Sequence, residues 1–81
     1  MAYKGYNGKT FQLVGADGHA VIAGSTVEDG EDSWILESAT APHKEASTGR
    51  VYVKLSNPKE GDYTGTREFF PSVVGLKFVE I

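Results

Sequence analysis

The sequence has no cysteine, so neither a disulfide framework nor a thiolate-bound metal can supplement the core of this protein. It has no apolar run near the roughly 20 residues that a membrane-spanning helix requires. The N-terminus has neither the basic start nor the apolar stretch of a signal peptide. We therefore expect a cytoplasmic protein that does not enter a membrane, with one domain over residues 1–81.

Helical periodicity is also scarce, because the ten glycines are spread along the chain and apolar residues do not recur at intervals of three and four. Strand-like alternation is present instead, separated by segments rich in glycine, proline and aspartate. This pattern predicts an all-β fold with five short strands, as a small barrel or a sandwich. The expected strands are 10–14, 19–23, 34–37, 50–55 and a last strand within 76–81, with loops at 38–49 and 56–66.

Two segments carry a resemblance to a known family. Trp34 follows the acidic loop 28–32, and Phe70-Pro71-Ser72 precedes the last strand. In these features the sequence resembles the SH3-like small β-barrels, where an acidic loop precedes a strand that opens with Trp and an aromatic-Pro-Ser segment forms a 3₁₀ turn. The resemblance implies a five-stranded SH3-like barrel, a shape shared with Sm-like proteins, with a short 3₁₀ turn before the last strand.

The resemblance does not extend to the family's peptide groove. Val73 and Val74 stand where the family carries a groove tyrosine, and the additional segment 40–60 separates the two matching parts. The resemblance therefore implies the architecture without the binding of proline-rich peptides, since function does not follow from fold alone.

The charges are divided along the chain. The net charge of the protein is -3, which argues against a module that depends on overall positive potential. Residues 25–40 contain five carboxylates and no cation, whereas residues 43–59 contain four cations and one carboxylate. This polarity favours complementary contacts between copies, and the alternative is that solvated loops simply differ in sign.

No motif indicates catalysis, a cofactor or a metal site. The acidic run 28–32 lacks the spacing of an EF-hand, and His19 and His43 both lie in polar turn or loop segments rather than on rigid elements. The sequence contains neither a Gly-x-Ser-x-Gly elbow nor a phosphate-binding glycine motif. We expect a protein that is not an enzyme and that has no cofactor.

One strand face is a candidate nucleic-acid surface. Arg50, Tyr52 and Lys54 alternate with apolar residues, so that two cations flank an aromatic ring on the outward face of one strand. Binders of single-stranded nucleic acid stack bases on such rings and contact phosphates with such cations. The alternative is an ordinary solvent-facing strand, because these residue types have adequate strand propensity.

The last segment is the candidate interface. Phe69 and Phe70 are adjacent and must point to opposite faces, and Val79 and Ile81 share a face that Leu76 and Phe78 do not. Apolar residues on both faces of a strand favour contact with another subunit. We expect a non-catalytic assembly module, a homo-oligomer or a binder of a protein partner, that uses Phe69, Val79 and Ile81 with Trp34 as a further contact. Nucleic-acid binding is the alternative function.

Overall fold

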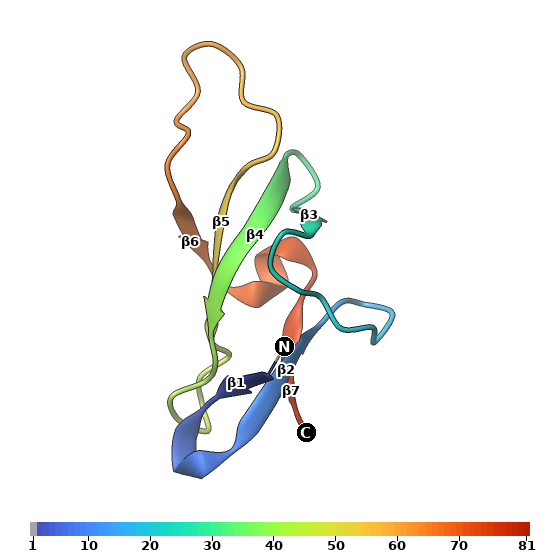
Figure 1. Ribbon diagram of the computed structural model, residues 1–81, viewed down its shortest axis with the longest axis vertical. Coiled ribbons are helices and arrows are strands. Elements are labelled where there is room, and N and C mark those ends of the chain that lie inside the picture. Colours follow the sequence, from blue (N-terminus) through green and yellow to red (C-terminus); the bar gives the residue numbers. More distant parts are fainter. Residues whose placement is uncertain (1) are drawn as a thin grey trace.

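The computed structural model describes residues 2–81 and consists of two antiparallel sheets (Figure 1). One sheet has the strand order β1-β2-β7, and the other has the order β3-β4-β5-β6. The expected all-β class is confirmed, with seven strands rather than five. The elements are β1 (Ala2–Lys4), η1 (Tyr6–Gly8), β2 (Thr10–Val14), β3 (Thr26–Glu28), β4 (Ser33–Thr40), β5 (Arg50–Leu55), β6 (Arg67–Phe69), η2 (Pro71–Val74) and β7 (Lys77–Glu80).

The core lies between the two sheets. Alternation along β2 and β5 turns Leu13, Val51 and Val53 inward, and all three side chains are completely buried. Trp34 of β4 joins this cluster with only 2% of its surface exposed. The predicted strands 10–14 and 50–55 are therefore confirmed, together with the faces that they bury.

The strand β4 is longer than the predicted strand 34–37. A register shift between Leu36 and Ser38 lets the strand continue to Thr40, where it still pairs with Arg50 of β5. A register shift of this kind is a β-bulge, which bends the strand without ending it. The predicted loop 38–49 therefore begins only at residue 41.

The predicted strand 19–23 is wrong. The turn before it forms, since the Asp17 carboxylate accepts the His19 amide at 3.0 Å, but only Ala20 makes an isolated bridge, to Val14. Beyond that bridge the Gly24 amide donates to the Leu36 carbonyl of the other sheet at 2.7 Å. Residues 19–21 make two hydrogen bonds with β2 and its end, from the Gly15 amide to the His19 carbonyl at 3.0 Å and from the Val21 amide to the Leu13 carbonyl at 2.9 Å. The segment then crosses to the other sheet before a strand can form.

The predicted 3₁₀ turn is confirmed as η2. Pro71 occupies its first turn, where the missing amide has no helical acceptor to lose, and the Gly75 amide bonds to the carbonyls of Pro71 and Ser72 at its end. Pro71 and Val74 are buried, so η2 closes one side of the core before β7 returns to pair with β2.

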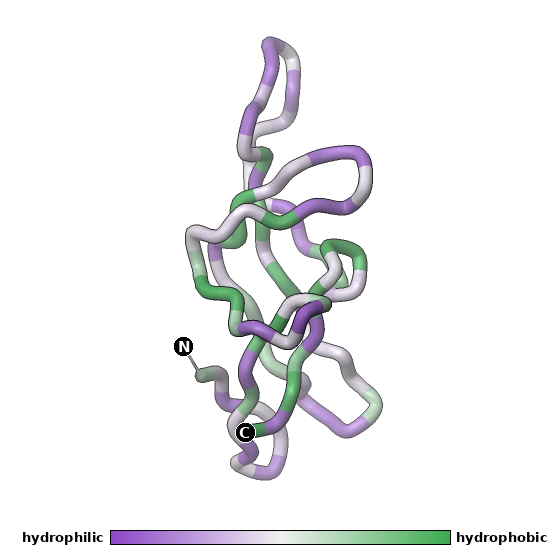
Figure 2. The backbone as a smooth tube through the Cα atoms, turned by 90° about the vertical axis from the view of Figure 1, so that its right-hand side faces the viewer, coloured by the Kyte–Doolittle hydropathy of each residue, from purple (hydrophilic) through white to green (hydrophobic). Residues whose placement is uncertain are grey.

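The molecule measures 44 × 23 × 19 Å along its principal axes. Its upper end in Figure 1 is the loop between β5 and β6, and the same loop is coloured mostly hydrophilic in Figure 2. Within residues 2–81, no helix has both the length and the apolar character needed to cross a membrane.

Candidate functional site

The basic strand face is assembled as predicted, but its cations are paired. Arg50 Nε lies 3.2 Å from Glu68 Oε1 on β6, and Lys54 Nζ lies 3.9 Å from Glu37 Oε2 on β4. Between them, the Tyr52 hydroxyl accepts a hydrogen bond from Thr40 at 3.2 Å. Two cations therefore face two carboxylates, and this face carries little free positive charge.

The two adjacent phenylalanines take opposite faces, as alternation requires. Phe69 packs edge-on against Trp34 with ring centroids 5.1 Å apart and is half-buried, whereas 52% of Phe70 is exposed beneath the Arg50 guanidinium. Trp34 lies inside the core and donates its Nε1–H to Asp29 at 3.1 Å. The structure thus places two expected contact residues, Phe69 and Trp34, mainly inside, and it exposes Phe70 in their stead.

The acidic segment 28–32 is an ordered turn. Asp29 Oδ1 accepts the amides of Glu31 and Asp32, both at 2.8 Å, while its Oδ2 accepts the Trp34 indole. These bonds, led by the one from the Asp32 amide, lower the pKa of Asp29 below its ordinary value. Within residues 2–81, no group of three or more histidine, aspartate or glutamate side chains is arranged to hold a metal ion.

The strand β7 leaves one edge of its sheet open, because β2 is its only strand neighbour. The Ile81 amide donates to the Thr10 carbonyl at 3.0 Å, so the backbone groups of Val79 and Lys77 also face β2. The amides and carbonyls of Phe78 and Glu80 then point to the open edge. Within the described part of the chain, no backbone hydrogen bond from another segment reaches them.

The side chains of this edge strand divide as the sequence predicts. Val79 is half-buried and Ile81 is 65% exposed, on the face opposite to Phe78. Phe78 instead points into the fold, where its ring lies edge-on to Tyr3 with centroids 5.5 Å apart. Of the predicted interface residues, Ile81 is therefore exposed next to an open edge, and Val79, which is half-buried like Phe69, lies on the same face of that strand.

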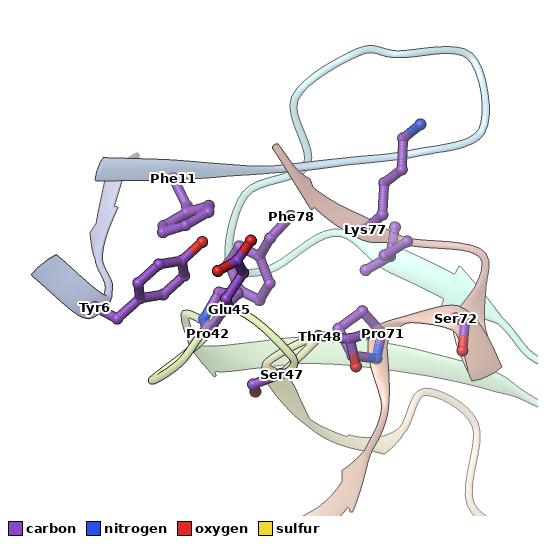
Figure 3. Close-up of a pocket in the computed structure, with 11 residues that line it drawn as sticks. Tyr6, Phe11, Pro42, Glu45, Ser47, Thr48, Pro71, Ser72, Lys77 and Phe78 are labelled. Carbon is purple, nitrogen blue, oxygen red and sulfur yellow. The ribbon is translucent and has the colours of Figure 1, made fainter. Parts of the chain in front are cut away.

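Sequence reasoning missed a pocket of about 240 Å³ where the β1-β2-β7 sheet meets the loop between β4 and β5 (Figure 3). Three distant segments form it: the start of the chain, the loop after β4, and the stretch from η2 to β7. Its lining residues are Tyr6, Phe11, Pro42, Glu45, Ser47, Thr48, Pro71, Ser72, Leu76, Lys77 and Phe78. The available signal was the inward alternation of Phe11 and Phe78, but nothing in the sequence placed them beside residues 42–48.

Aromatic rings form one end of this pocket. The Phe11 centroid lies 5.8 Å from that of Tyr6 and 6.4 Å from that of Phe78, whose ring is almost perpendicular at 84°. The Lys9 ammonium lies 5.0 Å from the Tyr6 centroid and 3.5 Å from Glu80. Glu80, and then Tyr6, raise the pKa of Lys9 above its ordinary value.

Comparison of the chain with protein-family models, with curated proteins and with solved structures finds no match. The functional conclusion therefore depends on the open edge of β7, the strand face and the pocket.

Proposed function

We propose that this protein is a non-catalytic assembly module, built as an SH3-like barrel, that self-associates by pairing the open edge of β7 with the same edge of a second copy. The single observation that carries this function is the unpaired edge itself. Phe78 and Glu80 present backbone donors and acceptors there, next to the half-buried Val79 and the exposed Ile81. An exposed edge of this kind is a template for another strand.

The SH3-like part of the proposal is supported by the order of the elements. The strands β4, β5 and β6 form a consecutive antiparallel meander, η2 follows, and β7 then returns to the sheet of β2. Trp34 stands near the start of β4 and Pro71 at the start of η2. These are the places that the family resemblance assigns to a tryptophan after an acidic loop and to a proline before the last strand.

One register fits the chemistry of the edge. Antiparallel pairing about a two-fold axis through Val79 sets this side chain against its own copy and aligns Phe78 with Glu80 of the second copy for backbone hydrogen bonding. Lys77 of one copy then lies opposite Ile81 of the second copy, and the isoleucine side chain covers the apolar stem of the lysine. Shifting the axis to Glu80 would set two carboxylates directly opposite each other, which is unfavourable.

Paired cations are the reason that we do not extend the proposal to nucleic acid. Arg50 and Lys54 each face a carboxylate of a neighbouring strand, so contact with a phosphate would have to break an ion pair. The non-catalytic role is proposed because His19 and His43 are exposed residues in different loops, with His19 paired to Asp17.

Substitution of Glu80 by proline tests the proposed edge. Proline at this position removes an amide that points outward and leaves the bonds between β7 and β2 intact, whereas Glu80→Ala removes the same carboxylate and keeps the amide. Both variants lose the ion pair to Lys9 equally. We expect wild type and Glu80→Ala to sediment as dimers, and Glu80→Pro to sediment as a folded monomer.

Two results would contradict the proposed edge. A Glu80→Pro protein that remains dimeric would place self-association elsewhere on the surface. A wild-type protein that is monomeric at millimolar concentration would remove self-association altogether. Circular dichroism of each variant separates loss of the dimer from loss of the fold.

A further inference from the structure

The pocket beside the loop between β4 and β5 combines three aromatic rings with a carboxylate. Tyr6, Phe11 and Phe78 come from η1, β2 and β7, and all of them line the same cavity. The nearly perpendicular Phe11 and Phe78 rings and the tilted Tyr6 ring form walls in different directions. With centroids 5.8 and 6.4 Å apart these rings pack against one another, and Phe11 is only 6% exposed, so they form one continuous aromatic surface at this end of the pocket.

The electrostatic character of the pocket selects a cation. Aromatic faces are negative and attract a cation within about 6 Å of the ring centroid. The Tyr6 ring already attracts one cation, because the Lys9 ammonium lies 5.0 Å from the ring centroid. Lys9 itself does not line the pocket. The ring therefore stands in a position where an ammonium group is favourable.

Glu45 adds a full negative charge to the rim. Its side chain is exposed and lines the same pocket as Tyr6 and Phe78, and Figure 3 shows it at the end of the pocket where these rings lie. Within residues 2–81 it forms neither an ion pair nor a side-chain hydrogen bond. The cation that also lines the pocket, Lys77, extends its ammonium away from the rings in the same figure.

We propose that this pocket binds a quaternary ammonium group, the chemistry shared by trimethylated lysine and choline. A bare ammonium must keep hydrogen-bond acceptors for its three N–H groups when it leaves water, and apart from the Tyr6 hydroxyl the three aromatic side chains offer only ring carbon. A quaternary ammonium has no N–H group that requires an acceptor, so contact with aromatic rings and attraction to one carboxylate are sufficient to stabilise it. The prolines and Leu76 extend the apolar lining for its alkyl stem.

The pocket lies within one copy and can be tested separately from the proposed dimer, although Lys77 and Phe78 belong to both. Phe78 points into the pocket side of β7, whereas Val79 and Ile81 occupy the opposite face. Variants of Tyr6 and Glu45 therefore test the pocket and leave Glu80 untouched, and either proposal can fail without the other.

The direct experiment is an NMR titration of the full chain with Nα-acetyl-Nε-trimethyl-lysine amide. The comparison ligands are the unmethylated lysine amide and a neutral analogue in which carbon replaces the quaternary nitrogen. We expect saturable shifts at Tyr6, Gly49 and Phe78, with affinity about tenfold higher for the trimethylated ligand than for either comparison. Choline and tetramethylammonium show whether the stem of a lysine side chain contributes to binding.

Two variants locate the site. Tyr6→Leu keeps an apolar side chain and removes a ring, and Glu45→Gln removes the charge of a surface residue and keeps its shape. Each should weaken binding at least about threefold, whereas Tyr63→Leu and Glu60→Gln, at an exposed ring and an exposed carboxylate of the distant β5–β6 loop, should have no effect. Because Glu45 is exposed, its variant stays informative even when Tyr6→Leu fails to fold.

Three outcomes would overturn the proposal. The first is an absence of saturable shifts with any quaternary ammonium ligand. The second is equal binding of the neutral analogue, which would make the pocket a simple apolar slot. The third is unchanged affinity in both Tyr6→Leu and Glu45→Gln, which would place binding elsewhere.

Discussion

At the scale of single residues, the most constrained backbone position is Gly49, directly before β5. Its φ of +80° lies in the left-handed region, and a Cβ added there would lie 2.6 Å from the Phe78 ring and 2.7 Å from the Thr40 carbonyl. Gly61 has a similar φ of +89° but no neighbour within 4 Å of such a Cβ. An alanine at position 61 would therefore introduce conformational strain alone, whereas an alanine at position 49 would introduce both strain and steric overlap.

We predict that Gly49→Ala destabilises the protein by about 3 kcal/mol or more, because it adds overpacking to the left-handed strain. The matched variant Gly61→Ala should cost only about 1 kcal/mol, the strain alone. Chemical denaturation followed by Trp34 fluorescence measures both. Equal losses in the two variants would show that the Phe78 ring yields freely to a methyl group at position 49.

Asp29 is the carboxylate whose protonation should matter for the β3–β4 turn. Its pKa in the folded chain is lowered by the amides of Asp32 and Glu31 and by the Trp34 indole, so its bonds stabilise the fold fully above the ordinary value of 3.8. That contribution is lost as the pH falls through the lower pKa of the folded state.

We therefore predict that Asp29→Asn lowers the thermal midpoint at neutral pH, since a single amide oxygen cannot replace both carboxylate oxygens. The difference from wild type should shrink as the pH falls through the lowered pKa of folded Asp29, because the wild-type carboxylate is then itself protonated. Glu60→Gln, at an exposed residue for which no hydrogen bond is found within residues 2–81, is the control. A difference that stays constant with pH would assign the effect to shape and not to charge.

At the scale of elements, sequence alternation predicted the longer strands and missed the shortest ones. Thr10–Val14 and Arg50–Leu55 alternate for five and six residues, which is enough to define a period. The strands β1, β3 and β6 have three residues each, and so short a stretch contains barely one full alternation. The crossing segment 19–23 shows the opposite error, because it leaves β2 for the other sheet after two backbone hydrogen bonds, which is too short a pairing to make a strand.

The register of β6 against β5 determines which of Phe69 and Phe70 packs inward. Alternation requires that these two side chains point to opposite faces but does not say which one is inside. The register pairs Phe69 with the fully buried Val51, and opposed residues of an antiparallel pair share a face. Phe69 therefore packs inward and Phe70 outward. The pocket was unpredictable for a similar reason, since only the tertiary fold brings residues 42–48 beside Phe78.

At the scale of the whole molecule, one ion pair joins the acidic segment 25–40 to the basic segment 43–59 within the described part of the chain. Lys54 of the basic segment reaches Glu37 of the acidic one, and Arg50 reaches Glu68. The expected attraction between copies therefore has fewer free charges to act through than the linear sequence implies. Self-association through β7 needs none of them, because it joins main-chain groups and the apolar residues Val79 and Ile81 across a continuous sheet of two copies.

The most direct test of this assembly is hydrogen exchange at the amides of Phe78 and Glu80, measured by NMR over a range of protein concentrations. Both amides point to the open edge, so they exchange rapidly in a monomer and become protected when a second β7 accepts their hydrogen bonds. The account predicts protection that rises with concentration at these two amides, while the Ile81 amide, bonded to Thr10, stays protected throughout. Rapid, concentration-independent exchange of Phe78 and Glu80 in a sample that sediments as a dimer would contradict it.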